Sequence, residues 1–378
     1  MRNMNVRSGM SRRGFMGAVG AGAAGLAGAA MFGSGVTFAQ SSSVTSPTLQ
    51  STLSRGKVLV GIGQVSILGV PPHDVPYYYD VKKDGDLLPD GFRYAGLDLD
   101  MGHCLSSAIF GDRNKVQFVQ ASSWSLRNQE LQDGLYDATY NEMTRKISRD
   151  VNWDVFQGPV YHYGTYEYLL RNGVNPTTAV WGSTTTVGDD VAKAIGGPNV
   201  TIRPYASDVE VAQAYLAGTI SAVGNSASTI VAVVMLLNMS NPNYTIRTCT
   251  QLGLDPIVAG VRSNDSVWQE IVSYVIYGLI NADAWGWTSQ NISNIYSRPQ
   301  NLSETQQRWL GLTTAGTGPE DNVNFKARWG VLNNSWLYYV IKQNGNYREI
   351  YERHVGPRSA GSANMSVQMG GALDTVHL

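Results

Sequence analysis

Short apolar segments and amphipathic segments alternate along most of the chain. Lys57–Gly63 is an apolar run that ends in glycine, which is typical of a buried strand entering a turn. Residues 96–110 carry apolar side chains at helical spacing, and Lys115–Val119 and Ser125–Gly134 predict the next strand and helix. The same alternation returns over Val180–Val234. Strands that alternate with helices predict an α/β sheet.

Longer elements follow in the last hundred residues, where Val267–Asn281 and Trp336–Gln343 predict helices. The stretch Gln64–Tyr94 is polar, and we predict it to be a long loop. The amino-terminal leader described below takes up 39 residues, which leaves roughly 340 residues. One hydrophobic core usually serves fewer residues than this, so we expect two lobes.

The amino end has a different pattern. Paired arginines in SRRGFM, residues 11–16, precede a weakly apolar run over residues 17–32, and Thr37–Ala39 follows with small residues. This layout is typical of a twin-arginine signal peptide, and the run is too short and too rich in glycine to anchor the chain in a bilayer. We predict a signal peptide over residues 1–39 and a periplasmic mature chain. The alternative is a cytoplasmic protein with a disordered basic leader.

Charge and composition narrow the possible partners. Charged residues make up 15% of the chain and hydrophobic residues 43%, and the formal net charge is -1. Such a balance provides neither the basic field that binds nucleic acid nor a patch that binds membranes. Beyond the leader, even the apolar stretch Ile230–Met239 is too short to cross a membrane. Transport or signalling would therefore need a membrane partner protein.

Candidate metal and catalytic residues are sparse. Cys104 and Cys249 fit no zinc spacing, and whether they form a disulfide stays open. No Gly-x-Ser-x-Gly elbow is present, which argues against a hydrolase, and we expect neither a metal nor a cofactor. The histidines are scattered along the chain: His73, His103, His162, His354 and His377.

Four motifs carry a family resemblance: GLDLD at residues 96–100, the segment 137–150, STTT at residues 183–186 and NGNYREIYER at residues 344–353. Together they resemble the periplasmic amino-acid-binding proteins of ABC importers, in particular the general L-amino-acid-binding branch of bacterial solute-binding protein family 3. The resemblance covers about Gly56–Gly356. It implies the type II periplasmic-binding fold, with two α/β lobes, two hinge crossings and a ligand cleft between the lobes.

The resemblance also implies a division of the chain. Residues 55–158 and 255–356 would build lobe 1, and residues 160–250 would build lobe 2. We predict a disordered tether over residues 40–54 and a flexible tail over residues 357–378.

An α-amino acid brings a carboxylate and an ammonium into such a cleft, and each needs a partner once water is excluded. Arg149 matches the family's carboxylate-binding arginine, whose planar fork suits a carboxylate. Thr144 matches a ligand-binding hydroxyl, and Thr184 and Thr185 match threonines that open a helix of the second lobe, where backbone donors favour anions.

Two of these matches have an ordinary structural alternative. Arg149 could instead form a surface ion pair with Asp150 or Asp154. Thr184 and Thr185 could simply cap their helix, which is compatible with ligand contact.

The chain departs from the family where the ligand ammonium is bound. Relatives place an aspartate there, and this chain has Ser226. Glu142 stands where relatives usually have a neutral side chain, so we hypothesise that Glu142 supplies the missing negative charge. The alternative is that Glu142 faces solvent or pairs with Arg145 or Arg149. In that case the ligand could lack an α-ammonium.

Aromatic residues are expected at the mouth of the cleft. Pro76–Tyr79 lies where relatives have an aromatic lid, and we select Tyr77 for ligand contact, since a tyrosine face suits an apolar group or a cation. Trp124 could line the same mouth or simply pack at a strand-to-helix turn.

These inferences predict a periplasmic solute-binding protein, not an enzyme. It would capture an amino acid or related small carboxylate and present it to an inner-membrane ABC permease. One alternative is a dehydratase or lyase on the same fold with Glu142 as general acid. Another is a sensor module that docks on a membrane receptor.

Overall fold

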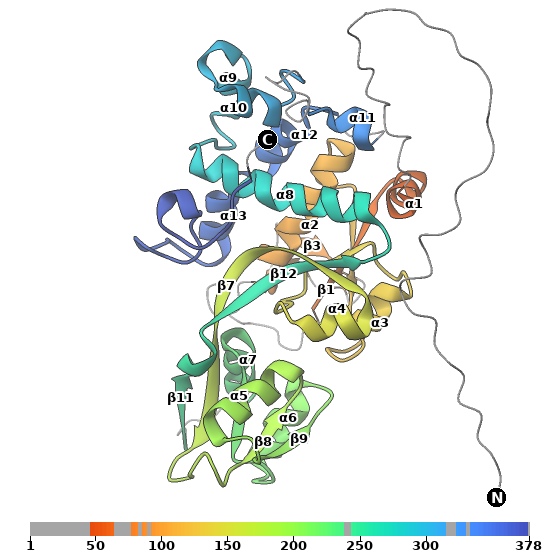
Figure 1. Ribbon diagram of the computed structural model, residues 1–378. Coiled ribbons are helices and arrows are strands. Elements are labelled where there is room, and N and C mark those ends of the chain that lie inside the picture. Colours follow the sequence, from red (N-terminus) through yellow and green to blue (C-terminus); the bar gives the residue numbers. More distant parts are fainter. Residues whose placement is uncertain are drawn as a thin grey trace, which may run out of the picture. The chain divides into compact units, whose positions relative to one another are not determined.

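The computed structural model divides the chain into a compact unit, Ser43–Leu378, and an amino-terminal unit, Met1–Ser42. The predicted signal peptide lies in the second of these, outside the described residues, and stays a prediction. The structure describes residues 46–63, 77–81, 85–88, 91, 93–237, 243–314, 323–329 and 333–376 (Figure 1).

The main sheet is mixed and has the strand order β5-β1-β6-β12-β7-β10-β8-β9, with β11 also paired to β7. Strand β1 pairs in parallel with β5 and β6, whereas β12 and β10 run antiparallel to β7. The predicted α/β fold class is confirmed. The strands are β1 (Val58–Ile62), β5 (Val116–Gln120), β6 (Ala138–Thr139), β7 (Val155–Arg171), β8 (Val180–Ser183), β9 (Thr201–Pro204), β10 (Ala222–Ser226), β11 (Tyr244–Thr248) and β12 (Leu254–Arg262).

Strand β7 belongs to two sets of neighbours. Its first part pairs with β12, up to Thr165 opposite Leu254. From Tyr166 onward it pairs instead with β10, and from Glu167 with β11. We call residues 46–165 and 254–376 lobe 1 and residues 166–253 lobe 2, so β7 and β12 are the two connections between the lobes (Figure 1).

Lobe 1 is built around long buried helices. In α2, every residue from Leu97 to Ile109 is buried, so the helix is enclosed on all sides and lacks a solvent face. Trp268, Trp309 and Trp336 are each at most 1% exposed and belong to the same core. The helices of lobe 1 are α1 (Pro47–Arg55), α2 (Leu97–Phe110), α3 (Arg127–Gln132), α4 (Ile147–Trp153), α8 (Ser266–Ala284), α9 (Ile292–Tyr296), α10 (Glu304–Trp309), α11 (Phe325–Trp329), α12 (Trp336–Asn344) and α13 (Tyr347–His354), with 3-10 turns at Pro299–Asn301 and Val367–Met369.

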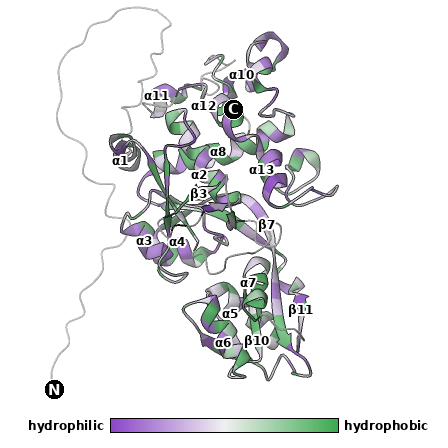
Figure 2. Cartoon of the chain, turned by 180° about the vertical axis from the view of Figure 1, so that it is seen from behind, coloured by the Kyte–Doolittle hydropathy of each residue, from purple (hydrophilic) through white to green (hydrophobic). Residues whose placement is uncertain are grey.

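Lobe 2 has a core on each side of its strands. Side chains alternate between the two faces of β7, so Tyr166 and Tyr168 join one cluster and Leu169 joins the other. The second cluster includes Ile230 and Val233 of α7, which is coloured hydrophobic over most of its length in Figure 2. The helices of lobe 2 are α5 (Thr186–Gly196), α6 (Asp208–Leu216) and α7 (Ala227–Leu237), with a 3-10 turn at Thr250–Leu252.

The predicted disordered tether over residues 40–54 is wrong from Ser46 onward, because α1 begins there. Ser46 caps the helix by accepting a hydrogen bond from Leu49 N, and Pro47 occupies the first turn, where its missing N–H costs nothing. The Ser46 hydroxyl also donates to Asp265 at 2.8 Å, and Leu49 is 4% exposed. The serine and threonine residues of this segment act as a helix cap and as buried contacts.

The carboxy-terminal segment is packed rather than a free tail. Arg358 forms an ion pair with Asp283 at 2.7 Å, and both side chains are almost fully buried. Asn364 accepts from Tyr163 N at 2.6 Å and donates to Tyr163 O at 2.9 Å, so it is bonded to the backbone of β7. The flexible tail predicted over residues 357–378 is therefore not observed through residue 376.

The predicted loop over residues 64–94 contains a small antiparallel sheet in the order β2-β4-β3. Residues 64–76 lie outside the described part of the chain. Period-two patterning is hard to recognise in strands of two or three residues, which explains the missed sheet. Its strands are β2 (Tyr79–Val81), β3 (Asp86–Leu87) and β4 (Arg93–Ala95).

The two cysteines are free and buried, and they lie in different cores: Cys104 in lobe 1 and Cys249 in lobe 2. In the part of the chain that the structure describes, no helix combines the length and apolar character needed to cross a membrane.

Candidate functional site

Two adjoining cavities are lined by residues of both lobes, and we call them together the cleft. The smaller has a volume of about 20 Å³ and the larger about 620 Å³. Trp124, Arg127 and Thr185 line both. Six of the seven residues predicted from the sequence line the cleft: Glu142, Thr144, Thr185 and Ser226 in the smaller cavity, and Arg149, Thr184 and Thr185 in the larger.

Glu142 has an unusual backbone conformation. Its φ angle is 52°, in the left-handed region that a glutamate rarely adopts and that costs on the order of 1–3 kcal/mol. Asp98 supports this turn by accepting from Glu142 N at 3.0 Å and from the Tyr161 hydroxyl at 2.6 Å. Asp98 is itself fully buried, which raises its pKa to about 7. Strain held in place by a buried network is typical of functional positions.

The carboxyl group of Glu142 contacts lobe 2 directly. It accepts a hydrogen bond from the Ser226 hydroxyl at 2.6 Å and another from the Ser228 hydroxyl. Burial raises the pKa of Glu142 to about 8 in spite of these two donors. Glu142 therefore neither faces solvent nor forms an ion pair with Arg145 or Arg149 among the described residues. The structure therefore brings together Ser226, which stands where relatives have an aspartate, and Glu142, the acid that we hypothesise to replace that aspartate.

Arg149 lies in the first turns of α4 and is 5% exposed. Its Nη1 donates to Thr144 O, and no carboxylate of the described residues forms an ion pair with it. Burial and then the charge of Arg127 lower the pKa of Arg149. The alternative, a surface ion pair with Asp150 or Asp154, is not found among the described residues.

The threonines at the start of α5 form a hydrogen-bonded group with neighbouring strands. Thr185 is the N-cap residue and accepts from Gly188 N at 3.4 Å, so the capping alternative is present. Thr184 donates to Asp208 at 3.3 Å and accepts from the Asn225 amide at 3.2 Å. These contacts fix the position of both hydroxyls at the cleft wall.

Arg127 is a charged cleft residue that sequence reasoning missed. It is 4% exposed, its Nη1 donates to Asn141 O at 2.8 Å, and its guanidinium lies 5.2 Å from the centre of the Trp124 ring. A usable signal was present, because a cation in the first turn of a helix is opposed by the helix dipole. Arg127 begins α3 and therefore needed another reason to be there.

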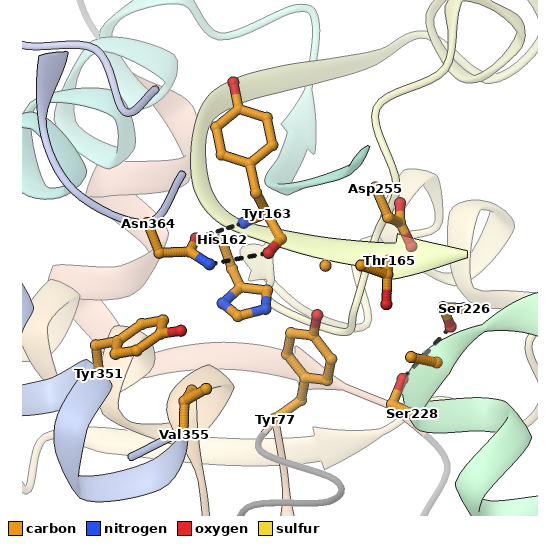
Figure 3. A pocket seen from close by; sticks show the side chains of 12 residues that line it. Tyr77, His162, Tyr163, Thr165, Ser226, Ser228, Asp255, Tyr351, Val355 and Asn364 are labelled. Carbon is orange, nitrogen blue, oxygen red and sulfur yellow. Dashed lines mark hydrogen bonds between the residues drawn. The ribbon is translucent and has the colours of Figure 1, made fainter. Parts of the chain in front are cut away.

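Tyr77 lies in a different cavity, of about 230 Å³, which we call the hinge pocket (Figure 3). Its ring stands edge-on to His162, with ring centres 5.3 Å apart. The neighbouring Tyr78 instead approaches Trp124, since a Cβ built on Gly63 would meet both rings within 3 Å. The structure thus distinguishes two of the three adjacent tyrosines. Tyr77 lines the hinge pocket, and Tyr78 lies beside Trp124.

The hinge pocket is lined by residues of β7, β10, β12, α13 and the start of α7, and no lysine or arginine of the described residues lines it. Asp255 is 1% exposed; the Thr144 and Tyr166 hydroxyls lie nearby, but neither is in hydrogen-bonding geometry with it. Burial raises the pKa of Asp255 to about 6 and lowers that of His162 to about 4. Ser226 lines both the hinge pocket and the cleft.

Two α/β lobes, connected by two crossing strands and enclosing a polar cleft, define a two-lobed ligand-binding protein of the periplasmic-binding type. A solved structure described as an ABC transporter / periplasmic binding protein from Brucella ovis with glutathione bound superimposes with a TM-score of 0.67. At 22% identity, it covers 87% of this chain and 98% of its own. This likeness confirms the predicted fold.

Sequence relatives agree, although no family model matches the chain. The general L-amino acid-binding periplasmic protein AapJ of Rhizobium johnstonii is 29% identical over 70% of this chain and 77% of its own. YhdW of Escherichia coli K12, a putative amino-acid ABC transporter-binding protein, is 27% identical over 82% and 91%. BztA of Rhodobacter capsulatus, a glutamate/glutamine/aspartate/asparagine-binding protein, is 25% identical over 70% and 76%. The chain is a relative of the periplasmic amino-acid-binding proteins of ABC importers, as its motifs predicted.

Proposed function

We propose that this chain is a periplasmic solute-binding protein that captures an amino acid or a related small carboxylate in the cleft. The observation that carries the proposal is Arg149, a buried guanidinium that opens into a cavity between two lobes and has no ion-pair partner among the described residues. A buried cation without a counterion is costly, and a bound carboxylate supplies one. The names of the relatives support an amino acid as the source of that carboxylate.

In this proposal the ligand acts by shifting the equilibrium between open and closed arrangements of the lobes toward the closed one. Arg149 and Glu142 belong to lobe 1, whereas Thr184, Thr185 and Ser226 belong to lobe 2, so a ligand that contacts both sets stabilises the closed arrangement of the lobes. The closed protein would be recognised by an inner-membrane ABC permease. Delivery to the periplasm by the twin-arginine pathway is part of this proposal and is supported by the SRRGFM motif at residues 11–16.

A screen by thermal unfolding tests the proposal. The protein is unfolded and refolded to remove bound ligand, then heated with each of the twenty L-amino acids, simple dicarboxylates, aromatic carboxylates and betaines. A ligand at about 100 times its Kd adds roughly 2.7 kcal/mol of stability, which raises the Tm measurably. We expect a response to carboxylates in the native chain and a much smaller one, or none, in Arg149→Ala. A flat response to every carboxylate in a folded native chain would contradict the proposal.

Glu142 gives a second candidate function some support. A buried carboxyl group whose pKa is raised to about 8 is protonated at neutral pH and could act as a general acid in a dehydratase or lyase. Turnover of a cyclic carboxylate, lost in Glu142→Gln, would favour this enzyme. Binding without turnover would leave the solute-binding function.

A further inference from the structure

The cleft holds two buried guanidinium groups, and we infer that its ligand carries two carboxylate groups, one bound by Arg149 and the other by Arg127. This inference rests on the proposed function and specifies its ligand class: an acidic amino acid or a small dicarboxylate.

Arg127 is placed to bind rather than only to pack. A guanidinium has five N–H donors, and the hydrogen bond that the structure records for Arg127 uses Nη1 and the carbonyl of Asn141. No nitrogen of Arg127 is both fully buried and unbonded, so its remaining donors are open to the cavities that it lines. The guanidinium of Arg127 also lies over the Trp124 ring, and this cation–π contact restrains its position. Arg149 likewise has one recorded side-chain hydrogen bond, to the carbonyl of Thr144, and lines the larger cavity.

Two cations in one cleft repel each other, and an arginine cannot relieve that repulsion by losing a proton. The structure compensates this repulsion only in part: the charge of Asp255 acts on both guanidinium groups through space, but Asp255 is hydrogen-bonded to neither. No carboxylate of the described residues forms an ion pair with Arg127 or Arg149. Glu142 lies near Arg127, but it is bonded to two serine hydroxyls and its pKa is raised. A ligand with one carboxylate would neutralise one guanidinium, and a ligand with two would neutralise both.

Other acids near the cleft do not replace the ligand. Asp189 and Glu210 line the larger cavity, where Asp189 is partly exposed and Glu210 is exposed and accepts from Ala206 N at 3.0 Å. Asp208 is buried but accepts from Thr184. Solvent and ions screen the charges of exposed acids at the edge of the cavity, so these acids compensate the charge of a buried cation poorly.

The arrangement suits an acidic α-amino acid at three points. Its α-carboxylate would bind Arg149 and its side-chain carboxylate Arg127, while its ammonium would meet Glu142 and Ser226. A simple dicarboxylate would use the same two arginines and leave Glu142 protonated. The two sources share the pair of carboxylates and differ only in their need for Glu142.

Isothermal titration of the refolded, ligand-free chain with matched ligand pairs tests the inference. The pairs are glutamate with glutamine, aspartate with asparagine, and glutarate with butyrate. We expect the member with two carboxylates to bind at least 10-fold more tightly. Arg127→Gln should remove this preference by weakening the charged member about 10-fold or more and the neutral member less than about 3-fold, whereas Arg127→Lys should retain part of it.

Arg145→Gln is the matched control, because Arg145 is exposed, donates to Gly158 O at 2.6 Å and lines neither cavity of the cleft. It should leave every affinity unchanged. Equal affinity for the two members of each pair in the native chain would overturn the inference, as would an equal loss for both members in Arg127→Gln together with a lower Tm. If no carboxylate binds at all, the proposed function fails instead. Glutamate and glutarate then separate the two sources, because only glutamate should lose affinity in Glu142→Gln.

Discussion

The cleft and the hinge pocket share Ser226 but differ in the kind of ionisable group that they bury. The cleft is lined by Arg127 and Arg149, which stay charged under all ordinary conditions. The hinge pocket is lined by Asp255 and His162, whose shifted pKa values bring both groups toward their neutral forms. A pocket of titratable groups can adjust by moving a proton, but a pocket of guanidinium groups needs an anion from outside. The comparison therefore marks the cleft as the place where a ligand is required.

Among the variants that test this comparison, Arg149→Ala should cause the largest loss of ligand affinity. Removing one partner of a buried charge pair costs about 2–5 kcal/mol, so we expect every carboxylate ligand to lose about 30-fold or more in affinity. The fold should persist, because the variant removes a buried cation that lacks an internal ion-pair partner. Titration calorimetry and circular dichroism measure the two quantities. Unchanged affinity in a folded variant would show that the cleft is placed wrongly.

Glu142→Gln should have a smaller and more selective effect. If the carboxylate of Glu142 binds the ligand ammonium, the variant should weaken amino acids by about 1.5–3 kcal/mol, or roughly 10-fold to 100-fold, and spare their desamino analogues. Because the pKa of Glu142 is raised to about 8 without ligand, binding an ammonium should release a proton near pH 7. Calorimetry in two buffers of different ionisation enthalpy detects that release. Equal affinities in the Gln and Glu forms would leave Glu142 a structural role only.

The same residue predicts a pH dependence of stability. Its pKa is higher in the folded chain than the ordinary value of 4.5, so the unfolded chain loses its proton first as the pH rises. Without ligand, Glu142 should therefore lower the free energy of unfolding progressively from about pH 4.5 to about pH 8. Asp98 acts in the same direction, so the informative quantity is the difference in Tm between the native chain and Glu142→Gln. That difference should favour the variant more at pH 8 than at pH 5.

Asp255→Asn should have the smallest effect. Asp255 forms no ion pair or hydrogen bond among the described residues, and the charges of Arg149 and Arg127 act on it only through space, so the neutral amide should leave carboxylate affinity within about 3-fold of the native value. Removing a buried acid without a hydrogen-bond partner should keep or raise the Tm at pH 8. A large loss of affinity for amino acids, with desamino analogues unaffected, would instead assign the ammonium to Asp255 and remove the contrast between the two cavities.

The sequence predicted elements that are long enough to show a periodic hydrophobic pattern. It missed elements that are too short to show one. Helix α8 was expected over Val267–Asn281 and spans Ser266–Ala284, because its apolar spacing continues for several turns. The small sheet β2-β4-β3 and helix α1 were missed, since two or three residues give no period and a capping serine resembles a flexible one.

The site shows the same division. Residues that match family motifs, such as Arg149 and Thr185, were predicted and do line the cleft. Arg127 was not predicted, because its role depends on the cavity around it rather than on any motif. Tyr77 was chosen from three adjacent tyrosines, and only the path of the backbone decides which ring faces which pocket.

Strand β7 also imposes an order on folding. Lobe 2 is one continuous segment, so its contacts can form as soon as residues 166–253 are available. Lobe 1 joins the beginning of the chain to its end, and β6 and β7 remain without a central partner until β12 is added. Closing that long loop carries an entropic cost that contacts inside lobe 2 do not. We therefore expect lobe 2 to form first during refolding and lobe 1 to acquire its structure only once the carboxy-terminal third has joined it.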